Sequence, residues 1–210
     1  MNTLQQVLPT AVKALVAAAA LIIANTAALA EQTPWKIQEQ DDGIFIYSRS
    51  VEGSSYNAIK ATMLIDSSMD RLSKLIGDGN GCPEWRAMCK FSEVIEDTSE
   101  HERYVYTVLD LPWPASDRDM VLHTKTQIDG DTNTATVHLS SDSTRHPAAD
   151  YVRAETSGRM IIHAVSDRQV EFTYIMHTEL GGSLPASSVN AGLIDGALVD
   201  LKRLRQLAEG

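Results

Sequence analysis

The sequence predicts an α+β fold, in which a curved antiparallel β-sheet wraps around a long C-terminal helix. Two observations predict it. From Phe91 onward, apolar segments of strand length follow one another, and only short turn-like segments such as residues 129–131 separate them. The chain then ends in one long amphipathic segment, residues 187–207. A sheet of this kind with one helix across its open side encloses an apolar tunnel.

The part of the chain before Phe91 predicts two strands and one helix. Residues 44–49 and 56–65 have the apolar, β-branched and aromatic character of strands, and turn-forming residues lie between them. Residues 66–69 then start a helix with a serine as its N-cap, because the apolar residues that follow are spaced as on one helix face. The glycine-rich segment 77–81 ends this helix.

Six further strands are expected after Phe91, and no helix is expected between them. They cover residues 92–95, 104–109, 119–128, 134–140, 152–162 and 170–177. Direct succession of strands without intervening helices indicates antiparallel pairing, since parallel strands need long crossover connections.

The final helix carries one apolar stripe and an unusually slim segment. The stripe consists of Val189, Leu193, Ala197, Leu201 and Leu204. The slim segment contains Gly192 and Gly196, although a glycine inside a helix is unfavourable by about 1 kcal/mol relative to alanine. Two interpretations remain open: close packing against the sheet, or space left beneath the helix for another molecule.

The first thirty residues are expected to be a signal peptide. Lys13 precedes an apolar core at residues 14–24, and Ala28-Leu29-Ala30 matches a small-x-small cleavage site. The apolar core is too short to span a bilayer, although an uncleaved membrane anchor is the alternative. We expect cleavage after Ala30, which leaves a single domain at residues 31–210 in the periplasm or outside the cell.

Composition restricts the partners and leaves the state of the cysteines open. A formal net charge of −10 disfavours nucleic-acid binding, which needs a basic surface. An exported protein can hold a disulfide between Cys82 and Cys89. One straight helix would keep their Cα atoms roughly 10 Å apart, too far for a bridge. Residues 77–83 argue against such a helix, so a bridged loop and two free thiols both remain open.

The most specific segment of the chain is residues 111–120. Pro112 and Pro114 hold Trp113 in extended backbone, because proline fixes its own φ and biases the preceding residue away from the helical region. Arg118 and Asp119 then open a strand. Charges at the start of a strand must be solvated or be satisfied inside the fold.

With these residues the chain resembles the START domain, the lipid-transfer module of the helix-grip superfamily, in a bacterial-type exported form. The central motif is Pro112-Trp113-Pro114-Ala115-Ser116-Asp117-Arg118-Asp119-Met120-Val121. Weaker pieces in the family's order are Tyr47-Ser48-Arg49, Pro83-Glu84-Trp85, Val152-Arg153 and Gly182-Ser183-Leu184-Pro185. The resemblance covers about residues 35–207.

The resemblance implies how such a protein works. It implies that a curved sheet grips the C-terminal helix, and that one sterol, phospholipid or similar hydrophobic molecule is bound in the tunnel and can be transferred. The C-terminal helix and neighbouring loops act as the gate, with transient membrane contact. We expect a monomer that needs no cofactor, no metal and no nucleic acid.

Strand alternation and the helix stripe select the candidate ligand-binding residues. Alternation sends every second residue from Arg118 onward to one face, which we take to be the concave face. Arg118 would then meet a polar group of the ligand or serve as a structural ion pair or loop anchor. The candidate residues of the tunnel lining and gate are Arg118, Met120, Leu122, Thr124, His138, Val189, Leu193 and Ala197.

Two points limit the functional prediction. In sterol-carrying members of the family, a second charged residue enters the cavity where this chain has Thr124 and Thr126, which lowers the expectation of sterol specificity. An enzyme on the same scaffold, such as a cyclase or hydrolase of a hydrophobic substrate, is the alternative. It would need an acid/base pair in the tunnel, for instance a histidine next to a carboxylate. No metal-ligand spacing or nucleophile motif is found in the sequence.

Overall fold

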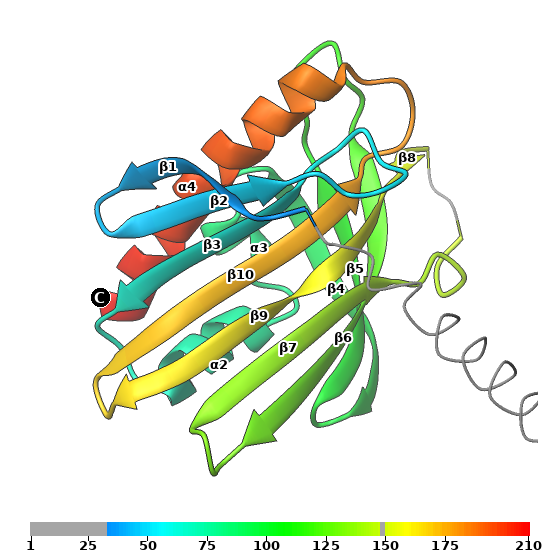
Figure 1. Ribbon diagram of the computed structural model, residues 1–210. Helices are drawn as coiled ribbons and strands as arrows, with labels where there is room; N and C mark the ends of the chain where they lie inside the picture. The colour runs from blue at the N-terminus through cyan, green and yellow to red at the C-terminus, as the bar shows by residue number, and fades with distance from the viewer. Residues whose placement is uncertain (1–32, 148–149) are drawn as a thin grey trace, which may run out of the picture. The chain divides into compact units, whose positions relative to one another are not determined.

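The computed structural model describes residues 33–147 and 150–210, so the expected signal peptide lies outside the described residues. Residues 34–210 form one unit with the predicted α+β architecture, in which a single large sheet curves around the C-terminal helix (Figure 1). The fold class predicted from the sequence is therefore confirmed.

Ten strands form the sheet, in the order β1-β2-β3-β10-β9-β7-β6-β5-β4, with β8 paired to β6. All neighbours are antiparallel except β8 and β6. The strands are β1 (Lys36–Asp41), β2 (Ile44–Arg49), β3 (Ala58–Ile65), β4 (Cys89–Ser99), β5 (Glu102–Leu109), β6 (Arg118–Asp129), β7 (Thr134–Ser141), β8 (Val152–Arg153), β9 (Glu155–Ser166) and β10 (Gln169–Glu179).

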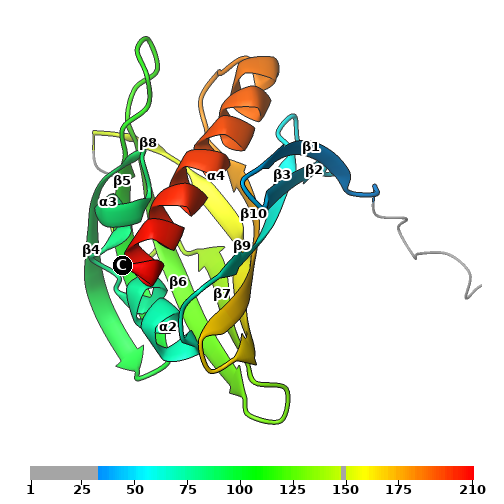
Figure 2. The ribbon, with the colours of Figure 1, turned by 90° about the vertical axis from the view of Figure 1, so that its left-hand side faces the viewer.

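Three helices are described: α2 (Met69–Gly77), α3 (Cys82–Trp85) and α4 (Ala186–Glu209). The predicted serine cap is present, because Ser68 Oγ accepts a hydrogen bond from the Arg71 backbone N–H at 3.2 Å. Figure 2 shows that α4 crosses the concave side of the sheet, with α2 and α3 on the same side. These helices and the concave face therefore enclose the interior.

Two strands differ from the sequence prediction. β1 was not expected, because its residues are exposed and lack the alternation of a half-buried strand. The strand expected at residues 152–162 is broken at Ala154, which is fully buried. The Ala154 backbone N–H donates to the Asp119 carbonyl at 2.8 Å, so β8 joins β6 before the chain turns into β9.

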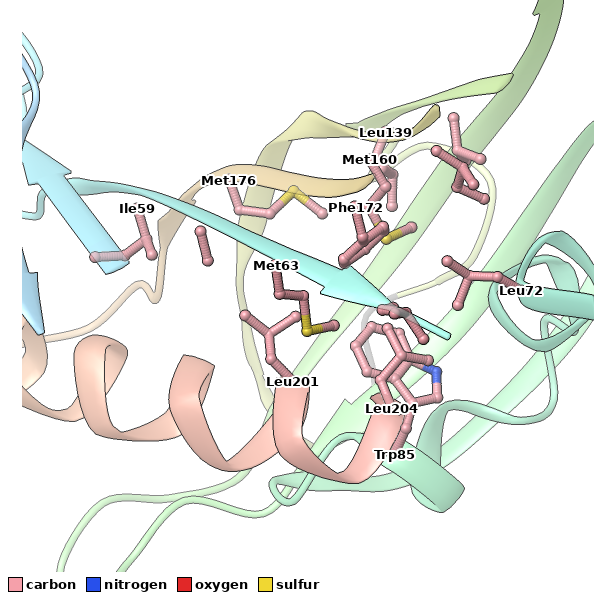
Figure 3. Packing of buried hydrophobic residues seen from close by; sticks show 14 of the residues in the cluster. Ile59, Met63, Leu72, Trp85, Leu139, Met160, Phe172, Met176, Leu201 and Leu204 are labelled. Carbon is pink, nitrogen blue, oxygen red and sulfur yellow. The ribbon is translucent and has the colours of Figure 1, made fainter. Parts of the chain in front are cut away.

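The apolar stripe of α4 divides into two parts. Leu201, Leu204 and Ala208 in the C-terminal half are buried in the main core, whereas no residue in the first half of the helix is fully buried. Figure 3 shows Leu201 and Leu204 among the core side chains, near Met63 and Trp85. The helix is thus anchored by its C-terminal half.

Basic residues near the end of α4 bind the β1–β2 hairpin. Lys202 pairs with Asp41, and Arg205 Nη2 lies 2.6 Å from Asp42 Oδ2. Arg205 also donates from Nη1 to the Asp42 carbonyl at 2.8 Å. These contacts attach the edge of the sheet to the helix, which explains why an exposed strand such as β1 is held in place.

The two cysteines form a disulfide, with Cα atoms 5.9 Å apart. This settles the alternatives left open by the sequence. The bridge is possible because α2 ends at Gly77 and α3 is a separate short helix, so Cys82 and Cys89 do not lie on one straight helix. The segment between them is closed into a small loop at the start of β4.

Arg118 and Asp119 are both buried at the start of β6 and point to different partners. Arg118 Nε donates to the Leu180 carbonyl at 2.9 Å, and Nη2 to the Gly181 carbonyl at 3.3 Å. Asp119 accepts two hydrogen bonds from Arg153, from Nε and Nη2, each at 2.9 Å. Together they join the loop after β5, the strand β8 and the turn after β10.

We predict that Asp119→Ala lowers the free energy of unfolding by about 3–5 kcal/mol, because it leaves the half-buried Arg153 guanidinium without its carboxylate. Urea unfolding followed by circular dichroism measures the change. Asp70→Ala is the matched control, since Asp70 pairs with Lys74 at 2.8 Å on an exposed helix face, where ion pairs contribute little. Equal losses in the two variants would contradict the structural role of Asp119.

Candidate functional site

A cavity of about 590 Å³ lies between the first half of α4 and the concave face of the sheet. The sheet contributes apolar side chains such as Ile59, Met120 and Met176, and the β5–β6 loop contributes Leu111 and Pro112. The helix provides the opposite wall with residues of its apolar stripe. A concave, mainly apolar space of this size is typical of small-molecule binding sites.

The slim segment of α4 leaves part of this space open. A Cβ atom built on Gly192 or on Gly196 would meet no other atom within 4 Å, and both glycines line the cavity. Close packing against the sheet, one of the two interpretations of these glycines, is therefore wrong at these two positions. The glycines leave space beneath the roof of the cavity.

A second cavity of about 450 Å³ extends toward α2. Its inner wall is apolar and includes Leu122, Val137 and Met160, whereas charged residues such as Lys74 and Arg103 lie among its other lining residues. Arg86 and Met176 line both cavities. The two spaces are therefore neighbours, with these side chains at the junction between them.

One charged cluster stands in the wall of the larger cavity. Arg86 Nη2 donates to the Tyr174 hydroxyl oxygen at 2.6 Å, and Asp200 Oδ1 accepts from the Ala87 backbone N–H at 2.7 Å. Burial raises the pKa of the Tyr174 hydroxyl and of the Asp200 carboxyl, and the nearby Arg86 guanidinium opposes both shifts. The cluster places one cation and one carboxylate near each other, without direct contact, in a mainly apolar wall.

Six of the eight candidate residues lie in the cavity walls. Met120, Val189, Leu193 and Ala197 line the larger cavity. Leu122 and Thr124 line the second one. The alternation along β6 places Val121 on the other face, where it packs with Tyr106 in a separate apolar cluster. The face chosen from the sequence for this strand therefore agrees with the structure.

The other two candidates, Arg118 and His138, line neither cavity. Arg118 is the loop anchor described above, because carbonyl groups of its own fold take up its donors. His138 lies between Val137 and Leu139, which face the second cavity, so strand alternation turns it to the convex face. There its Nε2 lies 3.1 Å from Gln127 Oε1.

Sequence reasoning missed Arg86, Tyr174 and Asp200. Asp200 did carry a signal, since it follows Leu193 by seven residues and is a carboxylate on the otherwise apolar face of the helix. Arg86 and Tyr174 carried none, because Arg86 directly follows α3 and Tyr174 lies on β10, and only the tertiary fold brings them together.

Two further features concern metal binding and membrane crossing by the described residues. Among residues 33–147 and 150–210, no three His, Cys, Asp or Glu side chains are grouped closely enough to hold a metal ion. Within the same described part of the chain, no helix is long and apolar enough to cross a membrane.

Comparison with known proteins places this geometry in a family. An uncharacterized protein of Pseudomonas aeruginosa is 32% identical over 184 residues, which cover 87% of this chain and 89% of that protein. The crystal structure of the STAR-related lipid transfer protein from Xanthomonas axonopodis is 28% identical, with a TM-score of 0.77 over 84% of this chain and 99% of that one.

The fold extends to more distant proteins. Human StAR-related lipid transfer protein 5 is 15% identical, with a TM-score of 0.76 over 94% of this chain and 96% of that chain, a likeness in fold. The family model for the START domain matches residues 15–210. The chain therefore belongs to the START domain family.

Proposed function

We propose that this protein binds one lipid-like molecule in the larger cavity and transfers it, after export to the periplasm or the extracellular space. Membership of the START family implies binding of a hydrophobic ligand. The observation that carries the proposal is the apolar cavity beneath a helix whose glycines leave space for a ligand.

Burial of apolar surface supplies the affinity. Enclosing a ligand with roughly 400 Å² of apolar surface contributes about 10 kcal/mol before other terms are counted. The loss of translational and rotational freedom on binding offsets part of this contribution. The free energy that remains is below about 10 kcal/mol, so we expect a dissociation constant near 1 μM, which corresponds to about 8 kcal/mol. No covalent step is needed for such binding.

The gate we propose consists of the first half of α4 and the β5–β6 loop. This half of the helix lines the cavity and lacks the fully buried residues that fix the second half, so it is the part of the wall that can move at least cost. Trp113 projects from the loop and is 92% exposed, whereas Pro112 and Pro114 beside it line the cavity. An exposed indole at the mouth suits contact with a membrane interface.

Carrier function is favoured over an enzyme on the same scaffold. Among the described residues, the lining of the larger cavity includes no histidine. The close histidine–carboxylate pairs, His123 with Glu102 at 2.7 Å and His177 with Glu179 at 3.4 Å, involve residues that line neither cavity. The acid/base pair that catalysis would need is therefore not brought to the site by these residues.

Export is proposed from the sequence of residues 13–30. The Cys82–Cys89 disulfide is compatible with it, because disulfides persist in oxidising compartments outside the cytosol.

Native mass spectrometry of the protein purified from its own host tests binding and export together. We expect a complex of one chain with one hydrophobic molecule, and a chain mass that corresponds to residues 31–210. Recovery of no hydrophobic molecule, together with no binding to a fatty acid, a phospholipid or a sterol, would refute the carrier function. A mass that includes residues 1–30 would refute signal-peptide cleavage alone.

Gly196→Leu is expected to fill the cavity without destabilising the helix. The new side chain projects into the open space, so affinity for a dansyl-labelled fatty acid falls about tenfold or more. Helix propensity favours leucine over glycine, so the melting temperature stays the same or rises. Val199→Leu, at a half-exposed position on the outer side of α4, should leave affinity unchanged. Undiminished affinity in Gly196→Leu would place the ligand elsewhere.

Trp113→Ser is expected to slow transfer without weakening binding. The indole is exposed and has no packing role in the protein, so its loss should lower association with phosphatidylcholine vesicles about tenfold, as measured by co-sedimentation. Ile37→Ser is the matched control, because Ile37 is 55% exposed on β1 and lines neither cavity. Equal effects of the two variants on vesicle association would argue against the loop as the membrane contact.

A further inference from the structure

Arg86 occupies a position that the binding of an apolar molecule alone does not explain. Its side chain lines both cavities and follows directly after the buried Trp85. The guanidinium lies over two aromatic rings, with Cζ 5.1 Å from the Trp85 ring centroid and 5.7 Å from that of Tyr174. The charge is therefore held at the junction of the two cavities.

The hydrogen bonds of Arg86 are incomplete. Nη2 donates to Tyr174, but the buried Nε–H has no acceptor among the described residues. A buried donor without a partner is unfavourable, and more so when the group is charged, so native proteins rarely leave one. Tyr174 accepts from Arg86 through its oxygen, which leaves its own O–H free to donate. The junction thus presents two donors.

The charge balance at the junction narrows the class of ligand. Asp200 stands in the same wall as Arg86 and offsets its charge. The Arg86 Nε–H and the Tyr174 O–H need an acceptor, and a protonated amine on a ligand cannot supply one. A carbonyl oxygen has two lone pairs and can accept from Arg86 and Tyr174 at once.

The walls show where the rest of the ligand lies. The larger cavity is lined mainly by apolar side chains of α4, the β5–β6 loop and the sheet. The second cavity has Asp70, Lys74 and Arg103 among its lining residues. A hydrocarbon chain therefore fits the larger cavity, with its polar end at the junction.

We propose that Arg86 and Tyr174 form the polar anchor of the site, and that they bind the carbonyl oxygen of a fatty acid or fatty-acyl ester whose chain fills the larger cavity. This inference rests on the proposed binding function and names its ligand class. Arg86 contributes the charged donor, Tyr174 the neutral donor, and Asp200 holds the segment of Arg86 through the Ala87 N–H.

The experiment compares three probes of one chain length: a long-chain carboxylic acid, its methyl ester and the corresponding alcohol. Their affinities are measured by displacement of a dansyl-labelled fatty acid from the full chain. We expect the acid and the ester to bind wild type about tenfold more tightly than the alcohol. Arg86→Met should remove this preference while keeping the affinity for the alcohol.

Two further variants serve as a substitute for Arg86→Met and as a control. Tyr174→Phe removes only the hydroxyl and should reduce the preference without changing the shape of the wall, so it serves if Arg86→Met does not fold. Arg168→Met, at an exposed residue of the β9–β10 turn, should leave all three affinities unchanged. Equal binding of the three probes to wild type, or an unchanged preference in Arg86→Met or Tyr174→Phe, would overturn the anchor. Failure of every probe to bind wild type would instead overturn the proposed binding function.

Discussion

The buried charges of Arg118 and Asp119 are the interaction on which the mouth of the cavity depends. Strand alternation turns these neighbours to opposite sides of β6. Arg118 donates hydrogen bonds to carbonyl groups of the turn after β10, and Asp119 accepts hydrogen bonds from Arg153 of β8. Three segments far apart in the sequence thus converge at one end of one strand. Because a buried charge without partners is strongly unfavourable, these segments are held to that arrangement.

The cavity walls formed by the β5–β6 loop and the first half of α4 can then vary without loss of the fold. The β5–β6 loop leaves the sheet at Leu109 and returns at Arg118, so its two ends are fixed while its middle lines the cavity. The helix α4 shows the same division along its own length. Leu201 and Leu204 secure its second half in the core, and Gly192 and Gly196 keep its first half clear of the sheet. Stability and binding therefore depend on different residues of one element.

Periodicity allowed most of the sheet and the long helix to be predicted from the sequence. It works for β2 and β7, because each has one buried face and the side chains alternate accordingly. It fails for β1, where neither face is buried. For His138 the strand was predicted correctly but the face was not, because a histidine between two apolar neighbours belongs to the opposite side.

The polar part of the site could not be predicted from local pattern. Arg86 meets Tyr174 across 88 positions of sequence, and Asp200 reaches Ala87 across 113. Such contacts depend on how the helices pack against the sheet, and no short sequence motif encodes this packing. The neighbouring disulfide could be left only as an option, since its geometry depends on α3 ending at Trp85, before Cys89 starts β4.

That disulfide has a consequence for ligand exchange. Cys82 and Cys89 close a loop that carries Arg86 and Met88, both in the wall of the larger cavity, and Trp85 in the core. This wall is therefore tied covalently to the start of β4, whereas the opposite wall is a helix fixed at only one end. In the gate that we propose, the helix moves while the proposed recognition groups, Arg86 and Tyr174, stay in place. The part of the wall that would admit a molecule is then separate from the part that would identify it, so under this proposal the rate of entry and the choice of ligand can evolve independently.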